Sequence, residues 1–203
     1  MPKRSFVEKK RKLFSRLFAA ALGALVLVSR SGWEQYGLVS DYLFLIGITM
    51  AGVATVGRLW CSLYICGYKT NKLISVGPYS LCRNPLYFFS LIGGLGVGLA
   101  TETLTVTLII LVAFVLYYPF MIRAEEKKLR KIHGDEFDRY VRNTPGFWPS
   151  LTLLNEPEEY TVRPKLFRKR VFDALWFIWF IGILEIIEAL HECNIIPILF
   201  RLY

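Results

Sequence analysis

One short stretch of this chain combines residue types that bind ligands. Residues 76–88 read VGPYSLCRNPLYF and place an arginine, an asparagine and two tyrosines directly before a long apolar run. The asparagine is followed by proline, which is typical of a helix start with Asn84 as the N-cap. That local role leaves Tyr79, Arg83 and Tyr87 unexplained unless they lie at a membrane interface or contact a ligand.

A second charged cluster, Glu125-Glu126, follows an apolar run that ends near residue 122. A charged pair so close to hydrocarbon is costly unless it meets a ligand or a partner. The alternative is an ordinary charged helix that leaves the membrane, in which Glu126 pairs with Arg130 four positions later. The residues of this cluster leave both interpretations open.

The composition places both clusters in a membrane protein. Of the 203 residues, 54% are hydrophobic and 15% aromatic, and the mean hydropathy is +0.41. A soluble domain of this length cannot bury so much apolar surface. The net charge of +9 lies in blocks between apolar runs, as in membrane proteins with basic loops on one side. We therefore expect no nucleic-acid partner.

The apolar runs predict an all-α integral membrane protein that forms a single domain over residues 1–203. About 20 apolar residues cross a bilayer core of roughly 30 Å. The five candidate transmembrane helices cover about residues 13–28, 38–59, 86–100, 104–122 and 171–190. The third and fourth are joined by three residues and should form a tight helical hairpin over about 86–122. The fifth contains acidic residues and could instead lie at the interface.

Basic residues predict the orientation of these helices. The tail up to Lys12, the loop at 61–85 and the segment at 123–170 carry six, three and twelve Lys or Arg residues. The positive-inside rule places all three on the cytoplasmic side and the C-terminus on the other side. Both ends of the hairpin then share one face. Residues near 80–87 should therefore be neighbours of residues near 122–130.

Other patterns in the chain predict structural roles. The glycines between residues 93 and 98 follow no strand and form no phosphate-binding loop, so we expect close helix packing there and around Gly47. Neither His133 nor His191 has a partner at metal-ligand spacing, and the four cysteines show no such spacing either. We therefore predict no metal site.

The two clusters together resemble the isoprenylcysteine carboxyl methyltransferase and phospholipid methyltransferase family of integral membrane enzymes. The likeness covers about residues 40–150, with GPYSLCRNPLY, a hydrophobic hairpin, and then EEKKLRKIHGDEFDRYVRNTPGFWP. Asn84 departs from the histidine of the eukaryotic isoprenylcysteine enzymes, and Phe137 replaces the first tyrosine of a Y-x-x-Y pair. The likeness does not extend to the additional apolar helix at about 171–190.

This resemblance implies that a cytoplasmic segment binds S-adenosylmethionine and that a lipophilic acceptor takes its methyl group. In the family an arginine shortly before the glutamate faces the acidic end of the substrate. Arg123 is the nearest candidate and is the predicted catalytic residue. The predicted cofactor-binding residues are Asn71, Lys72, Leu73, Ile74, Tyr79, Arg83, Asn84, Pro85, Leu86, Tyr87, Glu125 and Glu126.

The chemistry of methyl transfer narrows the acceptor slightly. The reaction needs alignment and a dry site more than a general base. A carboxylate arrives already ionised, so an isoprenylcysteine-like carboxylate is favoured, with a phospholipid amine or a small thiol as alternatives.

Two other classes of function stay open. One is a steroid-reductase-like membrane enzyme that uses NADPH. The other is a non-enzymatic protein whose basic segment binds anionic headgroups. In each case we expect a multi-pass protein of the bacterial or archaeal cytoplasmic membrane, or of the endoplasmic reticulum in a eukaryote.

Overall fold

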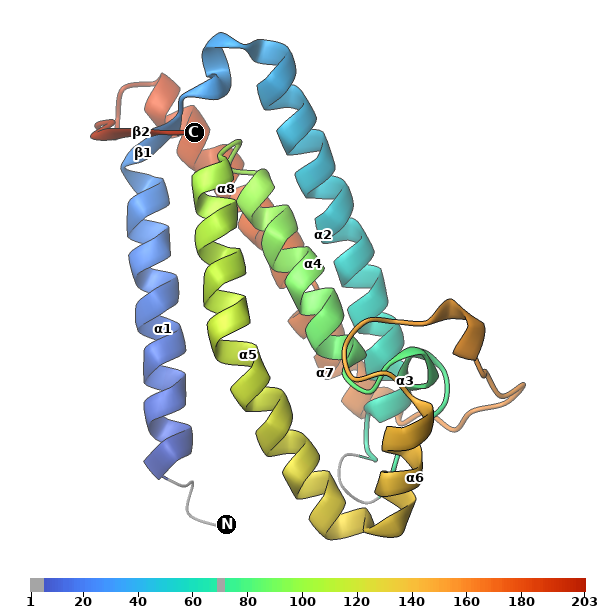
Figure 1. Ribbon diagram of the computed structural model, residues 1–203. Helices are drawn as coiled ribbons and strands as arrows, with labels where there is room; N and C mark the ends of the chain where they lie inside the picture. The colour runs from blue at the N-terminus through green and yellow to red at the C-terminus, as the bar shows by residue number, and fades with distance from the viewer. Residues whose placement is uncertain (1–5, 69–71) are drawn as a thin grey trace.

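The computed structural model describes residues 6–68 and 72–203, with the backbone alone for residues 6–16. Long helices run side by side and give an elongated molecule (Figure 1). The long helices are α1 (Phe6–Leu27), α2 (Gly37–Ile65), α4 (Pro85–Leu99), α5 (Leu104–His133), α7 (Pro164–Ala174) and α8 (Trp176–Glu192). The short elements are β1 (Ser29–Ser31), η1 (Trp33–Gln35), α3 (Pro78–Leu81), α6 (Asp135–Asn143), η2 (Leu151–Leu153) and β2 (Phe200–Leu202).

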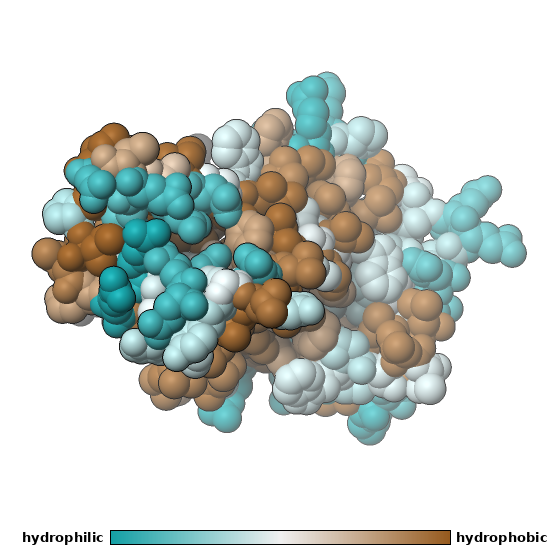
Figure 2. Space-filling view, turned by 90° about the horizontal axis from the view of Figure 1, so that it is seen from above, coloured by the Kyte–Doolittle hydropathy of each residue, from teal (hydrophilic) through white to brown (hydrophobic). Residues whose placement is uncertain are grey.

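The apolar surface of the long helices faces outward. Among the described residues, α2 and α5 are long and apolar enough to cross a membrane, and only 28% and 6% of their apolar windows are buried inside the protein. Large side chains such as Val56 and Leu116 are exposed, and apolar residues cover much of the surface seen end-on in Figure 2. A soluble helix would turn this face toward a core, so the protein is a membrane protein.

Judged by helix length and apolar composition, fewer of the described helices can span a membrane than the sequence predicts. Helix α4 has 15 residues, about 22 Å at 1.5 Å per residue, which is short for a bilayer core. The last apolar run is divided at Leu175 into α7 and α8. The predicted count of five transmembrane helices is therefore not confirmed.

Helices α4 and α5 form the predicted hairpin. They pack against each other and are joined by residues 100–103, where Glu102 has a φ of 56°. Helix α5 does not end near residue 122 but continues to His133. The glutamate pair therefore lies within a long helix, about two turns before its end.

Helices α2 and α4 cross at glycines. A Cβ atom at Gly47 would lie 2.5 Å from the backbone nitrogen of Ala100, and one at Gly96 would lie 2.7 Å from the carbonyl oxygen of Gly47. Only glycine lets two helix backbones approach so closely. The prediction that glycines serve close helix packing is confirmed at Gly47 and Gly96, but not at Gly52, where a Cβ atom would meet nothing within 4 Å.

This crossing predicts unequal effects for two substitutions on α2. Gly47→Ala should lower the free energy of unfolding by about 1–3 kcal/mol, because the added methyl group meets backbone atoms that cannot move aside. Gly52→Ala is the control, since a Cβ atom there meets nothing within 4 Å and alanine favours helix. Thermal unfolding in detergent compares the two variants, and equal losses would contradict the crossing.

The described structure also contains one pair of short strands, so the all-α prediction needs a correction. Strands β1 and β2 pair in parallel, with Ser29 opposite Phe200. The amide of Gly32 extends the pairing by donating to the carbonyl oxygen of Leu202 at 2.6 Å. Three-residue strands are too short to produce a readable alternation in the sequence. The pair lies at the end of the molecule opposite α6 (Figure 1).

Candidate functional site

Helices α3 and α6 lie at one end of the molecule (Figure 1). Residues of both helices line a cavity there. Residues from the end of α2, from α3, from the start of α4, from the second half of α5 and from α6 enclose about 100 Å³. The lining residues are Ile65, Tyr68, Lys72, Leu73, Ile74, Tyr79, Arg83, Asn84, Leu86, Tyr87, Glu125, Lys128, Leu129 and Tyr140.

The structure gathers most of the predicted cofactor-binding residues at this cavity. Those that line it are Lys72, Leu73, Ile74, Tyr79, Arg83, Asn84, Leu86, Tyr87 and Glu125. Pro85 is buried beside them at the first position of α4, and Glu126 bonds to two lining residues. Asn71 lies outside the described residues. Arg123 is exposed on a separate surface depression, so the geometry gives its predicted catalytic role no support.

Glu125 and Tyr87 meet across the hairpin. The Tyr87 hydroxyl donates to a carboxylate oxygen of Glu125 at 2.8 Å. The Tyr87 ring packs edge-on against the Tyr118 ring, with 5.2 Å between the ring centres. The hydrogen bond orients one carboxylate oxygen and leaves the other available. The predicted proximity of residues 80–87 and 122–130 is confirmed.

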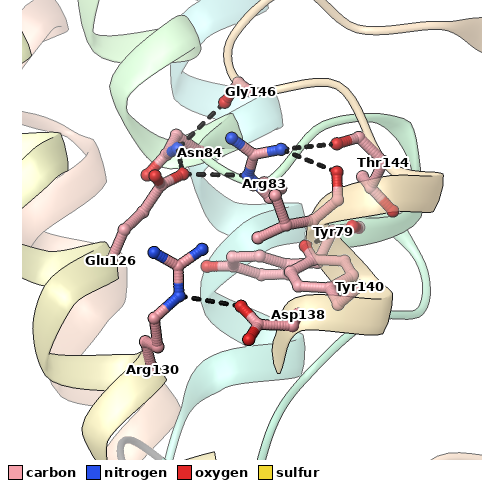
Figure 3. Close-up of polar contacts among 10 residues, drawn as sticks. Tyr79, Arg83, Asn84, Glu126, Arg130, Asp138, Tyr140, Thr144 and Gly146 are labelled. Atoms are coloured by element: carbon pink, nitrogen blue, oxygen red, sulfur yellow. Dashed lines mark hydrogen bonds and ion pairs between the residues drawn. The ribbon is translucent and has the colours of Figure 1, made fainter. Parts of the chain in front are cut away.

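Arg83 joins three elements at the wall of the cavity (Figure 3). Its Nε donates to Glu126 of α5 at 2.9 Å, and its Nη1 donates to the carbonyl oxygens of Val141 at 3.1 Å and Thr144 at 2.8 Å. The two paired side chains are only 16% and 24% exposed. Charge-assisted bonds of this kind hold the start of α4 against α5 and the end of α6.

Two predicted contacts within single helices, the N-cap of Asn84 and the pair of Glu126 with Arg130, are replaced by contacts with residues elsewhere in the chain. Asn84 occupies the N-cap position of α4 but makes no capping bond; its amide donates to Glu126 at 3.3 Å and to the carbonyl oxygen of Gly146 at 2.9 Å. Glu126 does not pair with Arg130, which instead bonds to Asp138 at 2.7 Å (Figure 3). The sequence pattern correctly marks these residues but misidentifies their partners.

Tyr79 has a buried hydroxyl group without a hydrogen-bond partner among the described residues. Its backbone carbonyl is satisfied by the Tyr140 hydroxyl, which donates at 2.6 Å. Burial raises the pKa of the Tyr79 phenol well above its usual value, so the hydroxyl stays a neutral donor. A buried donor without an acceptor is unfavourable, and a ligand in the cavity would relieve that cost.

Some lining residues were not predicted as site residues. Lys128 and Leu129 lie three and four residues after Glu125, on the same face of α5. That helical spacing could have identified them. Tyr68 could not be identified in this way, because it lies in the turn after α2 and the fold of that turn, not a helical spacing, brings it to the cavity.

Known proteins resemble this chain over most of its length. Residues 39–136 match the model of the phospholipid methyltransferase family. A cobalt-zinc-cadmium resistance protein, CzcN, of Cupriavidus metallidurans is 38% identical over 192 residues, which cover 95% of this chain and 88% of the relative. A nickel-cobalt-cadmium resistance protein, NccN, of Alcaligenes xylosoxydans xylosoxydans is 35% identical over 196 residues, which cover 97% and 91%. No solved structure matches significantly.

Proposed function

The chain belongs to the phospholipid methyltransferase family, and from that premise we propose that it transfers a methyl group from S-adenosylmethionine to a lipophilic acceptor. One observation carries the proposal: the cavity unites Glu125, oriented by Tyr87, with the unpaired hydroxyl of Tyr79. When bound, the cofactor would supply an electrophilic methyl group, whose bond to sulfur breaks and leaves its electron pair on sulfur as an acceptor atom takes the methyl.

The chemistry of the lining fits this cofactor. The carboxylate of Glu125 can accept hydrogen bonds from an amino group or from ribose hydroxyls, and the faces of Tyr68 and Tyr87 suit a sulfonium cation. Lys128 can pair with the carboxylate of the cofactor, and Ile74 offers an apolar surface to the adenine ring.

Binding would require the lining to open. The cavity holds about 100 Å³, whereas small-molecule sites typically hold about 300–1,000 Å³. The exposed side chains of Lys72 and Lys128 lie at the cavity and can move without breaking any contact described above. We propose that they move apart as the cofactor enters, from the cytoplasmic side according to the positive-inside rule.

The proposed acceptor is a lipophilic molecule with a carboxylate, such as an isoprenylcysteine-like lipid. The described lining contains no histidine that could take a proton from an ammonium group, and a carboxylate needs no deprotonation. A phospholipid amine or a small thiol remains the alternative acceptor.

Direct binding of metal cations is a second candidate function, because the names of both relatives concern metal resistance. Among the described residues, no group of three or more His, Cys, Asp or Glu could hold a metal ion. We propose that any contribution of this chain to metal resistance acts through the methylated acceptor.

Calorimetry on the purified protein tests the proposal. S-adenosylmethionine should bind and NADPH should not. Binding of NADPH alone would point to a reductase, and binding of neither would favour a protein that recognises anionic headgroups. Mass spectrometry of membranes incubated with labelled cofactor would then identify the methylated product.

Tyr79→Phe should separate binding from stability. Removing a buried hydroxyl that lacks a partner should leave the unfolding temperature unchanged or higher, while the affinity for S-adenosylmethionine falls about three- to tenfold, the value of one hydrogen bond. Tyr140→Phe is the matched control, because its hydroxyl is already bonded within the protein. That variant should lose about 1 kcal/mol of stability. An unfolding temperature that falls equally in both variants would remove Tyr79 from the site.

A further inference from the structure

Arg58 is a charged residue inside a helix that is apolar enough to cross a membrane. Between Asp41 and the end of α2 it is the only charged side chain. It lies seven residues before Ile65, which lines the cavity, and is therefore about 10 Å deeper along the helix. An ionisable group at such a depth is costly and is commonly kept for function.

The described surroundings of Arg58 contain no negative partner at contact distance. Its Nη1 donates to the Ser90 hydroxyl, and its guanidinium lies 5.6 Å from the centre of the Phe177 ring. The Nε is buried and has no hydrogen-bond partner in the described part of the chain. A guanidinium has five N–H donors, so one hydroxyl and one aromatic face leave most of its bonding capacity unused.

The position of Arg58 connects it to the cavity. Ser90 follows Leu86 by one helical turn and donates to the Leu86 carbonyl oxygen at 2.6 Å, and Leu86 lines the cavity. Leu86 also precedes Tyr87, which lines the cavity too and bonds to Glu125. The guanidinium is thus joined to the cavity wall through Ser90 and Leu86.

We propose that Arg58 binds the acidic group of the lipophilic methyl acceptor. The recognised chemistry is an oxyanion, a carboxylate or a phosphate, on a molecule whose apolar chain extends into the lipid around α2. The free N–H groups of Arg58 would form paired bonds to that oxyanion. Where the oxyanion is the carboxylate that accepts the methyl group, these bonds would hold its reacting oxygen at the membrane side of the cavity. The inference rests on the proposed function only in identifying the bound amphiphile as the methyl acceptor.

The competing explanation is that Arg58 is structural. Helix α8 covers it through Phe177, and the ring of Phe177 would lie 2.6 Å from a Cβ atom at Gly93, so the arginine could serve only to fix α8 against α2 and α4. In that case its replacement would lower stability and leave ligand preference unchanged.

Binding of paired amphiphiles to the full chain in detergent tests the proposal by native mass spectrometry. The carboxylate arm compares oleate with methyl oleate, and the phosphate arm compares dioleoyl phosphatidate with dioleoylglycerol. The wild-type protein should prefer the acid in at least one arm by about tenfold or more, the value of a charged hydrogen bond. The arm that shows the preference identifies the acidic group.

Two variants assign that preference to Arg58. Arg58→Gln should abolish the preference for the acid. Arg58→Lys keeps the positive charge but lacks the planar guanidinium, so it should retain a reduced preference. It serves as the test variant if Arg58→Gln does not fold. An undiminished preference in Arg58→Gln, or in Arg58→Lys where that is the folded variant, would overturn the inference. No acid preference in the wild-type protein would overturn it as well.

Calorimetry with S-adenosylmethionine on the same samples separates the two proposals. Cofactor binding without an Arg58-dependent preference would refute this inference alone. An Arg58-dependent preference without cofactor binding would refute the proposed function alone.

Discussion

Arg83→Met is expected to lower the free energy of unfolding by about 2 to 4 kcal/mol and to abolish cofactor binding. The substitution removes the charged donor of Glu126, which keeps only the Asn84 amide at 3.3 Å, and leaves the carbonyl oxygens of Val141 and Thr144 without the guanidinium. Breaking a buried ion pair by removing one partner costs about 3–5 kcal/mol. The loss expected here is about 1 kcal/mol smaller than that range, because both side chains are partly exposed and water screens the pair. Thermal unfolding in detergent measures the loss.

The chain provides its own control in Arg130→Met. Arg130 also bonds to a carboxylate, that of Asp138 at 2.7 Å, but the two side chains are 60% and 41% exposed. Exposed pairs contribute about 0–1 kcal/mol, so this variant should unfold close to the wild-type temperature. If the two variants lose the same stability, Arg83 does not hold the start of α4 in the way proposed.

Glu125→Gln is expected to weaken the binding of S-adenosylmethionine by about 10- to 100-fold. A hydrogen bond to a charged group is worth about 1.5–3 kcal/mol, and each 1.4 kcal/mol is tenfold in affinity. Stability should change little, because a glutamine oxygen can still accept the Tyr87 hydroxyl bond seen at 2.8 Å. Calorimetry with the cofactor gives the affinity, and thermal unfolding gives the stability.

Two further variants show whether the effect belongs to the cavity. Tyr87→Phe should weaken binding to a smaller extent, because it removes only the group that orients Glu125. Glu136→Gln changes an exposed carboxylate at the start of α6 and should bind the cofactor as the wild-type protein does. Unchanged affinity in Glu125→Gln would place that residue outside the site.

Much of the candidate site can be predicted from the sequence because its two halves flank a short hairpin. Two apolar runs joined by a few residues must be antiparallel neighbours, so the segments before the first and after the second lie at the same end. That reasoning brings Tyr87 to Glu125 before any coordinates are known. The start of α4 at Pro85 and the packing role of Gly96 follow from equally local properties, namely a fixed φ angle and a missing side chain.

The ion-pair partners of the charged residues on α5 could not be predicted from sequence spacing. Glu126 and Arg130 lie four residues apart on one helix, yet Glu126 bonds to Arg83, 43 residues away in sequence, and Arg130 bonds to Asp138. Which face of α5 turns toward α4 depends on packing along the whole hairpin. A half-buried carboxylate is stabilised more by a half-buried guanidinium than by an exposed neighbour on its own helix.

The sequence by itself determined the membrane environment, the hairpin and the residues that meet at the cavity, because apolar runs, turn residues and loop lengths are properties of contiguous segments. Only the tertiary structure decided that Asn84 bonds across the cavity wall instead of capping its helix, and that Arg123 lies outside the cavity. It also decided that the Arg58 guanidinium lies 5.6 Å from the ring centre of Phe177 in α8 and bonds to Ser90, with its Nε unpaired among the described residues. These outcomes depend on how helices distant in the chain rotate and pack, which no single segment encodes.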